Sequence, residues 1–430
     1  MLNVESPTSS SLGPAATPPS HVRARTGIWF VGARGSVATT ATVGLLAVQR
    51  GLAPTDGLVS ELPDVAAADL APLADLVVGG HDVATHTVAE QAAHLARSGV
   101  LPFGLPEQLA AELADVEGRI RPGIGAGVPQ REAADRLIAD LAAFRDEHGL
   151  DRVVVVDVSS TEPPVTPSPA LDDLATLEAE LDGGGSPLPL SSLYAYAAFR
   201  AGCPLAAFTP STGPACGALD ALARELGLPW AGRDGKTGET LVKSALAPLF
   251  GRRALRVNSW TAMNILGGGD GQTLSDPEAA KSKTTTKGLT VSEILGYPVE
   301  GPVRIDYVAD QGDWKTAWDH ISFSGFLGTR MTMQFTWQGA DSALAAPLVL
   351  DLVRLLDRAH EAGQAGPLAA LGFFFKEPLA GTTHALDEQW HTLVDWIGEL
   401  PARRTTAGAA SAPAPTAQPV QPEQPMQPTP

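Results

Sequence analysis

Residues 27–38 have the sequence G-I-W-F-V-G-A-R-G-S-V-A, and this stretch decides the fold. Its first five residues form an apolar run typical of a strand buried on both faces of a parallel sheet. The G-A-R-G turn follows at once, and apolar residues at helical spacing continue to about residue 50. A strand, a glycine turn and a helix in this order are the context in which a helix N-terminus binds a dinucleotide pyrophosphate. Arg34 replaces the second glycine of G-x-G-x-x-G, so an ordinary tight turn remains an alternative.

Strand-like and helix-like segments alternate from this stretch to about residue 250. The further strands are expected at 75–80, 152–157, 204–209 and 228–232. The further helices are expected at 87–97, 132–148, 191–201, 214–226 and 238–250. Such alternation predicts an α/β fold with a Rossmann-like, doubly wound parallel sheet.

The pattern changes after about residue 252. Strand-like segments at 256–263, 303–308, 321–326 and 330–337 follow one another, and antiparallel pairing is expected there. A long apolar helix at 341–361 then resembles a return to the first domain. The sequence therefore predicts an α+β domain, residues 252–340, inserted into a nucleotide-binding domain made of residues 26–251 and 341–402. Residues 1–25 and the Pro-rich residues 403–430 are expected to be disordered tails.

Composition excludes several classes of partner. The chain has 430 residues and a formal net charge of −18. We therefore expect neither nucleic acid nor an anionic membrane surface as a partner, because both bind a basic face. Its two cysteines have no metal-ligand spacing, and we expect them to be reduced core thiols and no metal to be bound. The sequence shows no membrane span and no secretory signal, which favours a cytoplasmic protein.

Polar residues follow the ends of several expected strands, where ligands bind in such sheets. Asp82 could accept hydrogen bonds from a ribose diol or could cap a turn. The hydroxyls of residues 159–161 are open to the same two interpretations. Residues 208–212 are a plausible wall of the same crevice. The segment 232–240, G-R-D-G-K-T-G-E-T, joins a strand to a helix but does not satisfy the P-loop pattern.

The stretch 264–287 has the sequence N-I-L-G-G-G-D-G-Q-T-L-S-D-P-E-A-A-K-S-K-T-T-T-K. Its glycines allow backbone to approach a ligand closely. Lys283 and Lys287 are four residues apart and would share one face of a helix, where an anionic ligand would relieve their repulsion. We interpret the stretch as a site for a phosphorylated small molecule beside a nucleotide. Lys315 in G-D-W-K and Lys376 after L-G-F-F-F are further candidates, since a desolvated lysine can transfer protons.

The order of these motifs resembles the myo-inositol-1-phosphate synthase (inositol-3-phosphate synthase) family over about residues 27–400. The motifs that carry the resemblance are V-G-A-R-G-S, D-L-V-V-G-G-H-D, V-S-S-T-E, F-T-P-S-T, R-D-G-K-T-G-E-T, N-I-L-G-G-G-D-G, S-K-T-T-T-K, G-D-W-K-T-A-W-D, A-A-P-L-V-L-D-L and F-K-E-P-L. The resemblance implies an NAD-binding domain with an inserted catalytic and tetramerising domain. It also implies redox-neutral cyclisation of glucose 6-phosphate to inositol phosphate, by oxidation at C5, enolisation, aldol closure and re-reduction.

The resemblance also implies roles for individual residues. Lys283 and Lys376 would lie nearest the reacting carbons, Lys287 and Lys315 would assist and bind phosphate, and Asp319 would orient a lysine. The residues expected around NAD are Gly32, Arg34, Gly35, Ser36, Asp82, Ser159, Ser160, Thr161, Thr209, Asp234, Thr237, Gly268, Gly269, Asp270, Asp313 and Asp351.

The chain departs from the family pattern near the cofactor. Gly268 and Gly269 replace two asparagines, Arg34 lies in the nucleotide loop, and His81 replaces a tryptophan. These departures indicate a diverged branch that retains the main lysines. Two alternatives therefore stay open. One is an oxidoreductase or cyclase acting on another sugar or cyclitol phosphate, and the other is a non-catalytic nucleotide-binding relative.

Overall fold

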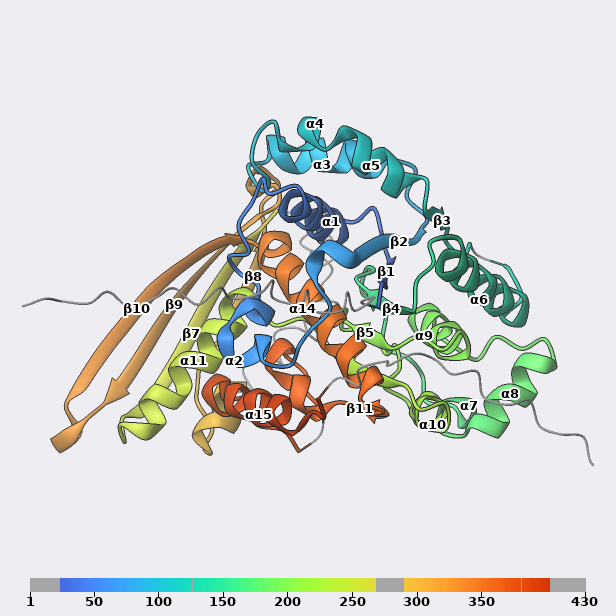
Figure 1. Ribbon diagram of the computed structural model, residues 1–430. Coiled ribbons are helices and arrows are strands. Elements are labelled where there is room, and N and C mark those ends of the chain that lie inside the picture. The colour runs from blue at the N-terminus through green and yellow to red at the C-terminus, as the bar shows by residue number, and fades with distance from the viewer. Residues whose placement is uncertain (1–23, 126, 268–289, 380, 403–430) are drawn as a thin grey trace, which may run out of the picture. The chain divides into compact units, whose positions relative to one another are not determined.

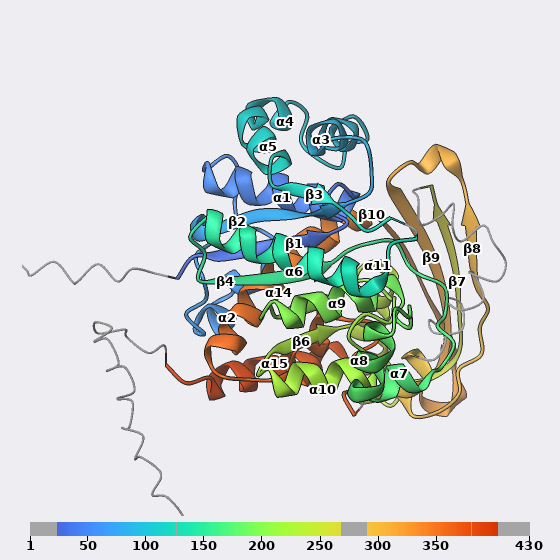
Figure 2. The same ribbon diagram turned by 90° about the vertical axis from the view of Figure 1, so that its right-hand side faces the viewer.

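Strands β1 (Thr26–Val31) and β4 (Arg152–Asp157) are neighbours at the centre of a parallel sheet. Alternate residues of each strand enter different cores. Ile28 and Val154 face a core formed with α1 and α14, whereas Trp29 and Val155 face a core formed with α6, α9 and α10. Helices cover both faces of the sheet (Figures 1 and 2). The uninterrupted apolar run that predicted a buried strand follows from this double burial.

The sheet has the strand order β11-β6-β5-β4-β1-β2-β3, and every pair in it is parallel. Its other strands are β2 (Leu76–Asp82), β3 (Ile120–Pro122), β5 (Leu205–Ala207), β6 (Pro229–Gly232) and β11 (Gly366–Pro367). The order reverses between β1 and β4, which is the switch point where ligands bind in doubly wound sheets. The predicted fold class is confirmed.

The helices that the sequence predicted lie close to their expected ranges. In the described part of the chain, helices with eight or more residues include α1 (Ser36–Gln49), α3 (Val88–Arg97), α5 (Ala110–Glu117), α6 (Gln130–Glu147), α8 (Leu174–Asp182), α9 (Leu190–Arg200), α10 (Gly217–Glu225), α11 (Gly238–Arg252), α14 (Asp341–Glu361) and α15 (Leu386–Glu399). Shorter ones include α2 (Pro63–Ala66), α4 (Leu105–Gln108) and α7 (Pro169–Asp172). The sequence did not predict α2, α4, α5, α7, α8, α15, β3 or β11. Most of these elements are too short to show a clear hydrophobic period.

A second sheet has the strand order β10-β9-β7-β8 (Figure 2). Its strands are β7 (Arg256–Leu266), β8 (Val303–Tyr307), β9 (Trp314–Ser324) and β10 (Arg330–Ala340). Helix α11 covers one face, where Phe250 packs with Trp260 and Ile321. The expected antiparallel pairing is confirmed for β9 with its two neighbours, but β7 and β8 are parallel. Strand β9 also begins seven residues earlier than expected, at Trp314 instead of residue 321. Lys315 and Asp319 lie on the same face as the buried Ala317 and Ile321, so the first half of the strand lacks a regular alternation of apolar and polar residues.

The structure is a computed structural model that describes residues 24–125, 127–267, 290–379 and 381–402. Within these residues, those up to Pro401 belong to one compact unit. The division into a nucleotide-binding domain and an inserted domain at 252–340 therefore stays a prediction. Arg25, which the sequence assigned to the disordered N-terminal tail, donates its backbone N–H to Asp151 Oδ2 at 2.7 Å. Across the described segments, no helix combines the length and the apolar character needed to cross a bilayer.

Candidate functional site

The turn between β1 and α1 has the backbone geometry of an anion site. Gly32 has φ +87°, and a Cβ atom there would lie 3.1 Å from Ser159 Cα, so the turn requires glycine on both counts. Gly35 is the N-cap residue of α1 and has an extended conformation with no side-chain cap. The side chain of Ser36, the first helical residue, accepts a hydrogen bond from Gln91 Nε2 at 3.1 Å. Since no side chain caps the helix, its N-terminus suits a pyrophosphate.

Asp82 lies at the end of β2, directly beside this turn. Its Oδ2 accepts the backbone N–H of Arg34 at 2.6 Å, and its Oδ1 accepts that of Ala84 at 2.7 Å. The carboxylate therefore caps a turn, as one of the two interpretations has it. Its binding of a ribose diol at this strand end stays a prediction. Gly80 makes the approach of turn and strand feasible, since a Cβ atom there would lie 2.4 Å from Phe30 O.

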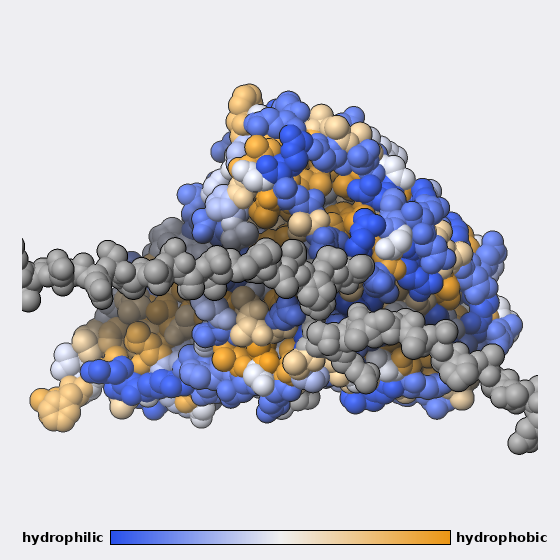
Figure 3. All heavy atoms as spheres, viewed as in Figure 1, coloured by the Kyte–Doolittle hydropathy of each residue, from blue (hydrophilic) through white to orange (hydrophobic). Residues whose placement is uncertain are grey.

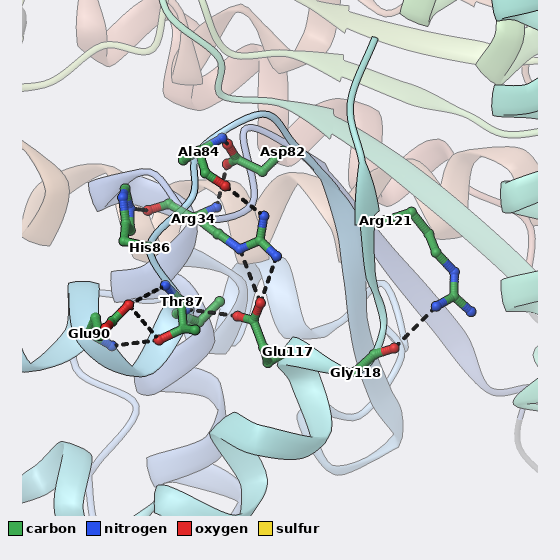
Figure 4. Close-up of polar contacts among 10 residues, drawn as sticks. Arg34, Asp82, Ala84, His86, Thr87, Glu90, Glu117, Gly118 and Arg121 are labelled. Carbon is green, nitrogen blue, oxygen red and sulfur yellow. Dashed lines mark hydrogen bonds and ion pairs between the residues drawn. The ribbon is translucent and has the colours of Figure 1, made fainter. Parts of the chain in front are cut away.

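The Arg34 side chain lies between the end of α5 and the loop after β2 (Figure 4). Its Nη2 donates to Glu117 Oε1 at 2.6 Å, and its Nη1 donates to Ala84 O at 3.0 Å. Glu117 Oε2 in turn accepts the backbone N–H of Val88, the first residue of α3, at 2.9 Å. The guanidinium that could have bonded the pyrophosphate is therefore engaged by a carboxylate.

Residues after β4 form the next wall of the site. Ser159 donates both its backbone N–H and its hydroxyl to Asp157 Oδ1, at 3.0 and 2.7 Å. Asp157 Oδ2 is buried and lacks a hydrogen-bond partner in the described part of the chain. Burial raises the pKa of Asp157 to about 6. Ser160 and Thr161 follow as exposed residues. Sequence reasoning did not single out Asp157, although it is the last residue of a predicted strand.

The loop after β6, residues 232–238, joins several predicted residues. The backbone N–H of Asp234 donates to the carbonyl of Thr209, whose own side chain is buried, at 3.3 Å. Asp234 has φ +59°, and its Oδ1 accepts from Lys376 Nζ at 2.9 Å. The Lys376 backbone N–H also donates to Asp234 O at 2.6 Å. Asp234 therefore holds Lys376 by both main chain and side chain.

A second lysine reaches the same loop through another aspartate. Lys315 on β9 places its Nζ 2.9 Å from Asp341 Oδ2, at the start of α14. Asp341 Oδ1 lies 3.4 Å from the Thr237 hydroxyl, which donates to it. The 232–238 loop is thus linked to both lysines, each through an aspartate. Asp341 was not predicted, and its position at the N-terminus of a predicted helix was the only sequence signal.

Asp319 lies in a buried charged cluster between α11 and the second sheet. It accepts from Trp260 Nε1 at 2.7 Å, and its Oδ1 lies 3.9 Å from Lys243 Nζ. Lys243 in turn lies 2.5 Å from Glu239 Oε1, and both side chains are almost fully buried. Among the described residues Lys243 is a lysine close to Asp319, and the prediction that Asp319 orients a catalytic lysine stays a prediction. The i, i+4 spacing of Glu239 and Lys243 on a predicted helix was an available signal.

Lys236, in the G-K-T segment, is a further buried cation that the sequence did not assign. Its Nζ donates to Gln389 Oε1 on α15 and lies 5.7 Å from the centre of the Phe373 ring. Burial lowers the pKa of Lys236 to about 7. The side chain also lines a cavity of about 490 Å³ between α1 and α14.

Two predicted cofactor residues have other partners. Asp313 Oδ2 lies 3.1 Å from His94 Nε2 on α3. Both carboxylate oxygens of the buried Asp351 accept backbone N–H groups, from Val59 and Ser60, at 2.9 Å. Burial raises the pKa of Asp351 to about 6. These contacts account for both residues as links between elements, so their places near NAD stay predictions.

Five predicted residues lie outside the described part of the chain. They are Lys283, Lys287, Gly268, Gly269 and Asp270. Their roles stay predictions from the sequence.

Comparisons with known proteins agree with the geometry. The NAD-binding family model described as myo-inositol-1-phosphate synthase matches residues 26–397. Inositol-3-phosphate synthase 1 of Bacteroides thetaiotaomicron is 32% identical over 419 residues, covering 87% of this chain and 96% of that protein. Inositol-3-phosphate synthase of Trypanosoma brucei brucei is 29% identical over 388 residues, covering 78% and 73%.

Solved structures share the fold. The inositol-3-phosphate synthase of Caenorhabditis elegans has a TM-score of 0.76 at 22% identity, with 88% of this chain and 87% of that chain covered. A myo-inositol-1-phosphate synthase-related protein of Thermotoga maritima has a TM-score of 0.70 at 23% identity, with 87% and 98% covered.

Proposed function

The chain belongs to the myo-inositol-1-phosphate synthase family, and from this premise we propose that it converts D-glucose 6-phosphate to 1D-myo-inositol 3-phosphate. The reaction is an NAD-dependent cyclisation without net redox change. It comprises oxidation at C5, enolisation at C6, aldol attack of C6 on C1 and re-reduction at C5. The observation that carries the proposal is the pair of lysines linked through aspartates to one loop at the carboxyl edge of the NAD-type sheet.

The residues after β1, β2 and β4 suit NAD. They would hold the cofactor, which supplies the hydride chemistry that oxidation and re-reduction at C5 require. The uncapped N-terminus of α1 would receive the pyrophosphate, with Gly32 and Gly35 allowing close approach. Asp82 would accept a ribose hydroxyl. The orphaned Oδ2 of Asp157 offers a further acceptor beside Ser159.

Lys376 and Lys315 would act on the sugar phosphate. The enolate that forms when C6 loses a proton carries negative charge on O5, and a fixed ammonium group stabilises this charge in a site shielded from water. Asp234 and Asp341 hold the two ammonium groups in place. We assign Lys376 to the reacting carbons, and Lys315 to phosphate binding and assistance. Lys283 and Lys287 would complete the cationic set.

Incubation of the purified protein with glucose 6-phosphate and NAD tests this function. We expect inositol phosphate to form, as detected by phosphorus NMR or mass spectrometry, without net growth of NADH absorbance. Absence of both inositol phosphate and its 5-keto intermediate would contradict the proposal. Steady growth of NADH would instead favour the alternative of an oxidoreductase that stops after the first step.

We also place the protein in the cytoplasm as a homotetramer. The tip of the β9–β10 hairpin supports assembly, since Phe326 and Leu327 are 88% and 87% exposed there. Figure 3 shows hydrophobic surface at the lower left, where Figure 1 shows the end of this hairpin. The open face of the second sheet adds the exposed side chains of Met263 and Trp318. Light scattering should give four times the 44.5 kDa chain mass, and a monomeric mass would contradict the assembly. Cell fractionation tests the location.

A further inference from the structure

Arg34 occupies a position from which a cation can select between two dinucleotides. Its backbone N–H donates to Asp82 Oδ2 at 2.6 Å, so Arg34 and the ribose-side carboxylate are in direct contact. NADP differs from NAD by a phosphate on the 2′-oxygen of the adenosine ribose. In Rossmann-like sheets an acidic residue after the second strand binds the 2′-hydroxyl of NAD, whereas a nearby arginine accommodates the 2′-phosphate of NADP. This chain has both residues at that place.

The Arg34 guanidinium is already hydrogen-bonded to other groups, so it is not available to bind a 2′-phosphate. The Arg34 guanidinium donates to Glu117 Oε1 through Nε at 3.2 Å and through Nη2 at 2.6 Å. Its Nη1 donates to Ala84 O at 3.0 Å. Its side chain is only 16% exposed. Three bonds in a planar fork fix the guanidinium against α5 and the loop after β2 (Figure 4).

The other charged residues drawn in Figure 4 do not replace the Arg34 guanidinium as a cationic partner for a 2′-phosphate. Arg121 donates to Gly118 O and pairs with Glu147 at 3.6 Å, and Figure 4 shows it away from Asp82. Glu90 adds another carboxylate in the same group, where it accepts from the backbone N–H of Thr87. A 2′-phosphate would therefore meet carboxylates at Asp82, Glu117 and Glu90 and no uncommitted guanidinium among the residues drawn in Figure 4.

We propose that Glu117 determines coenzyme specificity, because it engages Arg34 and so denies the 2′-phosphate of NADP its cationic partner. The proposal deepens the NAD use stated above and rests on it. Glu117 touches neither reacting atoms nor sugar phosphate in this scheme, and it acts through Arg34. Removing its charge should release the guanidinium toward the 2′-phosphate, with which arginine makes strong, charge-assisted hydrogen bonds.

The test is equilibrium binding of NAD and of NADP, measured by calorimetry without sugar phosphate. Glu117→Gln keeps the shape of the side chain and an acceptor for the Val88 N–H. We expect it to lower the Kd for NADP by about tenfold, as one charge-assisted contact to phosphate would give. The Kd for NAD should change by less than about twofold. Arg34→Gln in the Glu117→Gln background should abolish the gain.

Glu112→Gln is the matched control. It removes the same charge from the same helix, but Glu112 pairs with Arg50 instead of Arg34. If Glu112→Gln lowered the Kd for NADP by the same factor as Glu117→Gln, the proposal would be overturned. The loss of one negative charge from the helix would then explain the tighter binding. An unchanged NADP affinity in folded Glu117→Gln would also overturn it.

A third variant covers failure of Glu117→Gln to fold, which its melting temperature would reveal. Arg34→Gln alone should leave the Kd for NADP unchanged, because the guanidinium is already engaged. A tenfold weakening of NADP binding in Arg34→Gln would overturn the proposal. These results are separate from the proposed function. A wild-type protein that binds NAD but makes no inositol phosphate leaves the specificity test valid, whereas one that binds neither dinucleotide contradicts both.

Discussion

The two ends of the candidate site are built differently. At the dinucleotide end, backbone N–H groups of the turn after β1 donate to the end of β2, those of Gly32 and Ala33 to the His81 carbonyl and that of Arg34 to the Asp82 carboxylate. At the lysine end, cations meet carboxylates from elements far apart in the sequence, as in the Lys376–Asp234 and Lys315–Asp341 pairs. The first end depends on backbone geometry and the second on paired side-chain charges. Single substitutions should therefore affect the lysine end more strongly.

The largest effect is expected from Lys376→Met. It removes the ammonium group assigned to the enolate oxygen while keeping the length of the side chain. We expect turnover to fall at least ~1,000-fold, comparable with the loss of an oxyanion-stabilising donor. The measurement is the rate of inositol phosphate formation. The control is Arg253→Met, which removes an exposed cation at the end of α11. Loss of less than tenfold in Lys376→Met would remove Lys376 from the catalytic set.

Lys243→Met tests the buried charges that support the lysine end. It removes a buried ammonium group that lies 2.5 Å from Glu239 Oε1 and 3.9 Å from Asp319 Oδ1. Breaking a buried pair from one side costs about 3 kcal/mol or more in the free energy of unfolding. Denaturant unfolding gives this value, and Arg252→Met, at an exposed ion pair on the same helix, should cost under about 1 kcal/mol. If both variants lost the same amount of unfolding free energy, the buried cluster would not stabilise the protein more than an exposed ion pair does.

Asp234→Asn tests whether the carboxylate positions Lys376. The amide can still accept a hydrogen bond but no longer pairs a charge, so we expect turnover to fall about 10- to 100-fold, less than in Lys376→Met. The combined variant should be no slower than Lys376→Met alone, because both changes disrupt one unit. Additive losses in this cycle, measured by the same product assay, would show that Asp234 acts independently of Lys376.

The smallest expected effect is on the pH dependence of the free energy of unfolding, through His81 at the dinucleotide end. Burial lowers the pKa of His81, which accepts from Trp29 Nε1 at 2.8 Å and lies 3.1 Å from Asp140. The folded state therefore binds a proton less readily than the unfolded state, and His81 makes stability fall as pH drops below about 6.5. The slope can reach about 1.4 kcal/mol per pH unit for one proton.

The comparison of wild type with His81→Gln isolates this contribution. Asp157 and Asp351, whose pKa values are raised to about 6, have the opposite effect. Each stabilises the folded state at low pH, where its carboxyl group is protonated, and this contribution is lost as the pH rises through about 6. Unfolding curves from pH 5 to 8 should therefore show a steeper gain with pH in wild type than in the variant. Parallel curves would mean that His81 titrates as it does in the unfolded chain.

Much of the fold was predictable from local patterns. The apolar run before Gly32 and the alternation of segments to residue 250 identified the parallel sheet, because strands buried on both faces show continuous hydrophobicity. The pairing of β7 with β8 was not predictable, since register and direction depend on contacts between distant segments. The short helices α4 and α7 were missed because four residues carry no measurable period.

The candidate site shows the same difference between what local patterns predict and what depends on contacts between distant segments. Asp82 and Ser159 were found because each follows a predicted strand, and parallel strands end at one edge. The partners of the side chains were not found. Glu117 lies 83 residues from Arg34, and Asp234 lies 142 residues from Lys376. Sequence spacing carries no signal at such separations.

Local patterns in the chain were enough to predict the parallel α/β core, the glycine turn before α1 and the residue types at the strand ends. These features arise from interactions between residues near one another in the chain, such as hydrophobic periodicity and the conformational freedom of glycine. Packing of distant elements, in contrast, pairs Arg34 with Glu117, links Lys315 and Lys376 to residues 232–238, and brings Lys243 beside Asp319. These contacts could not be predicted because a charge interacts with partners according to their distance in space and their burial, and both depend on how the elements pack.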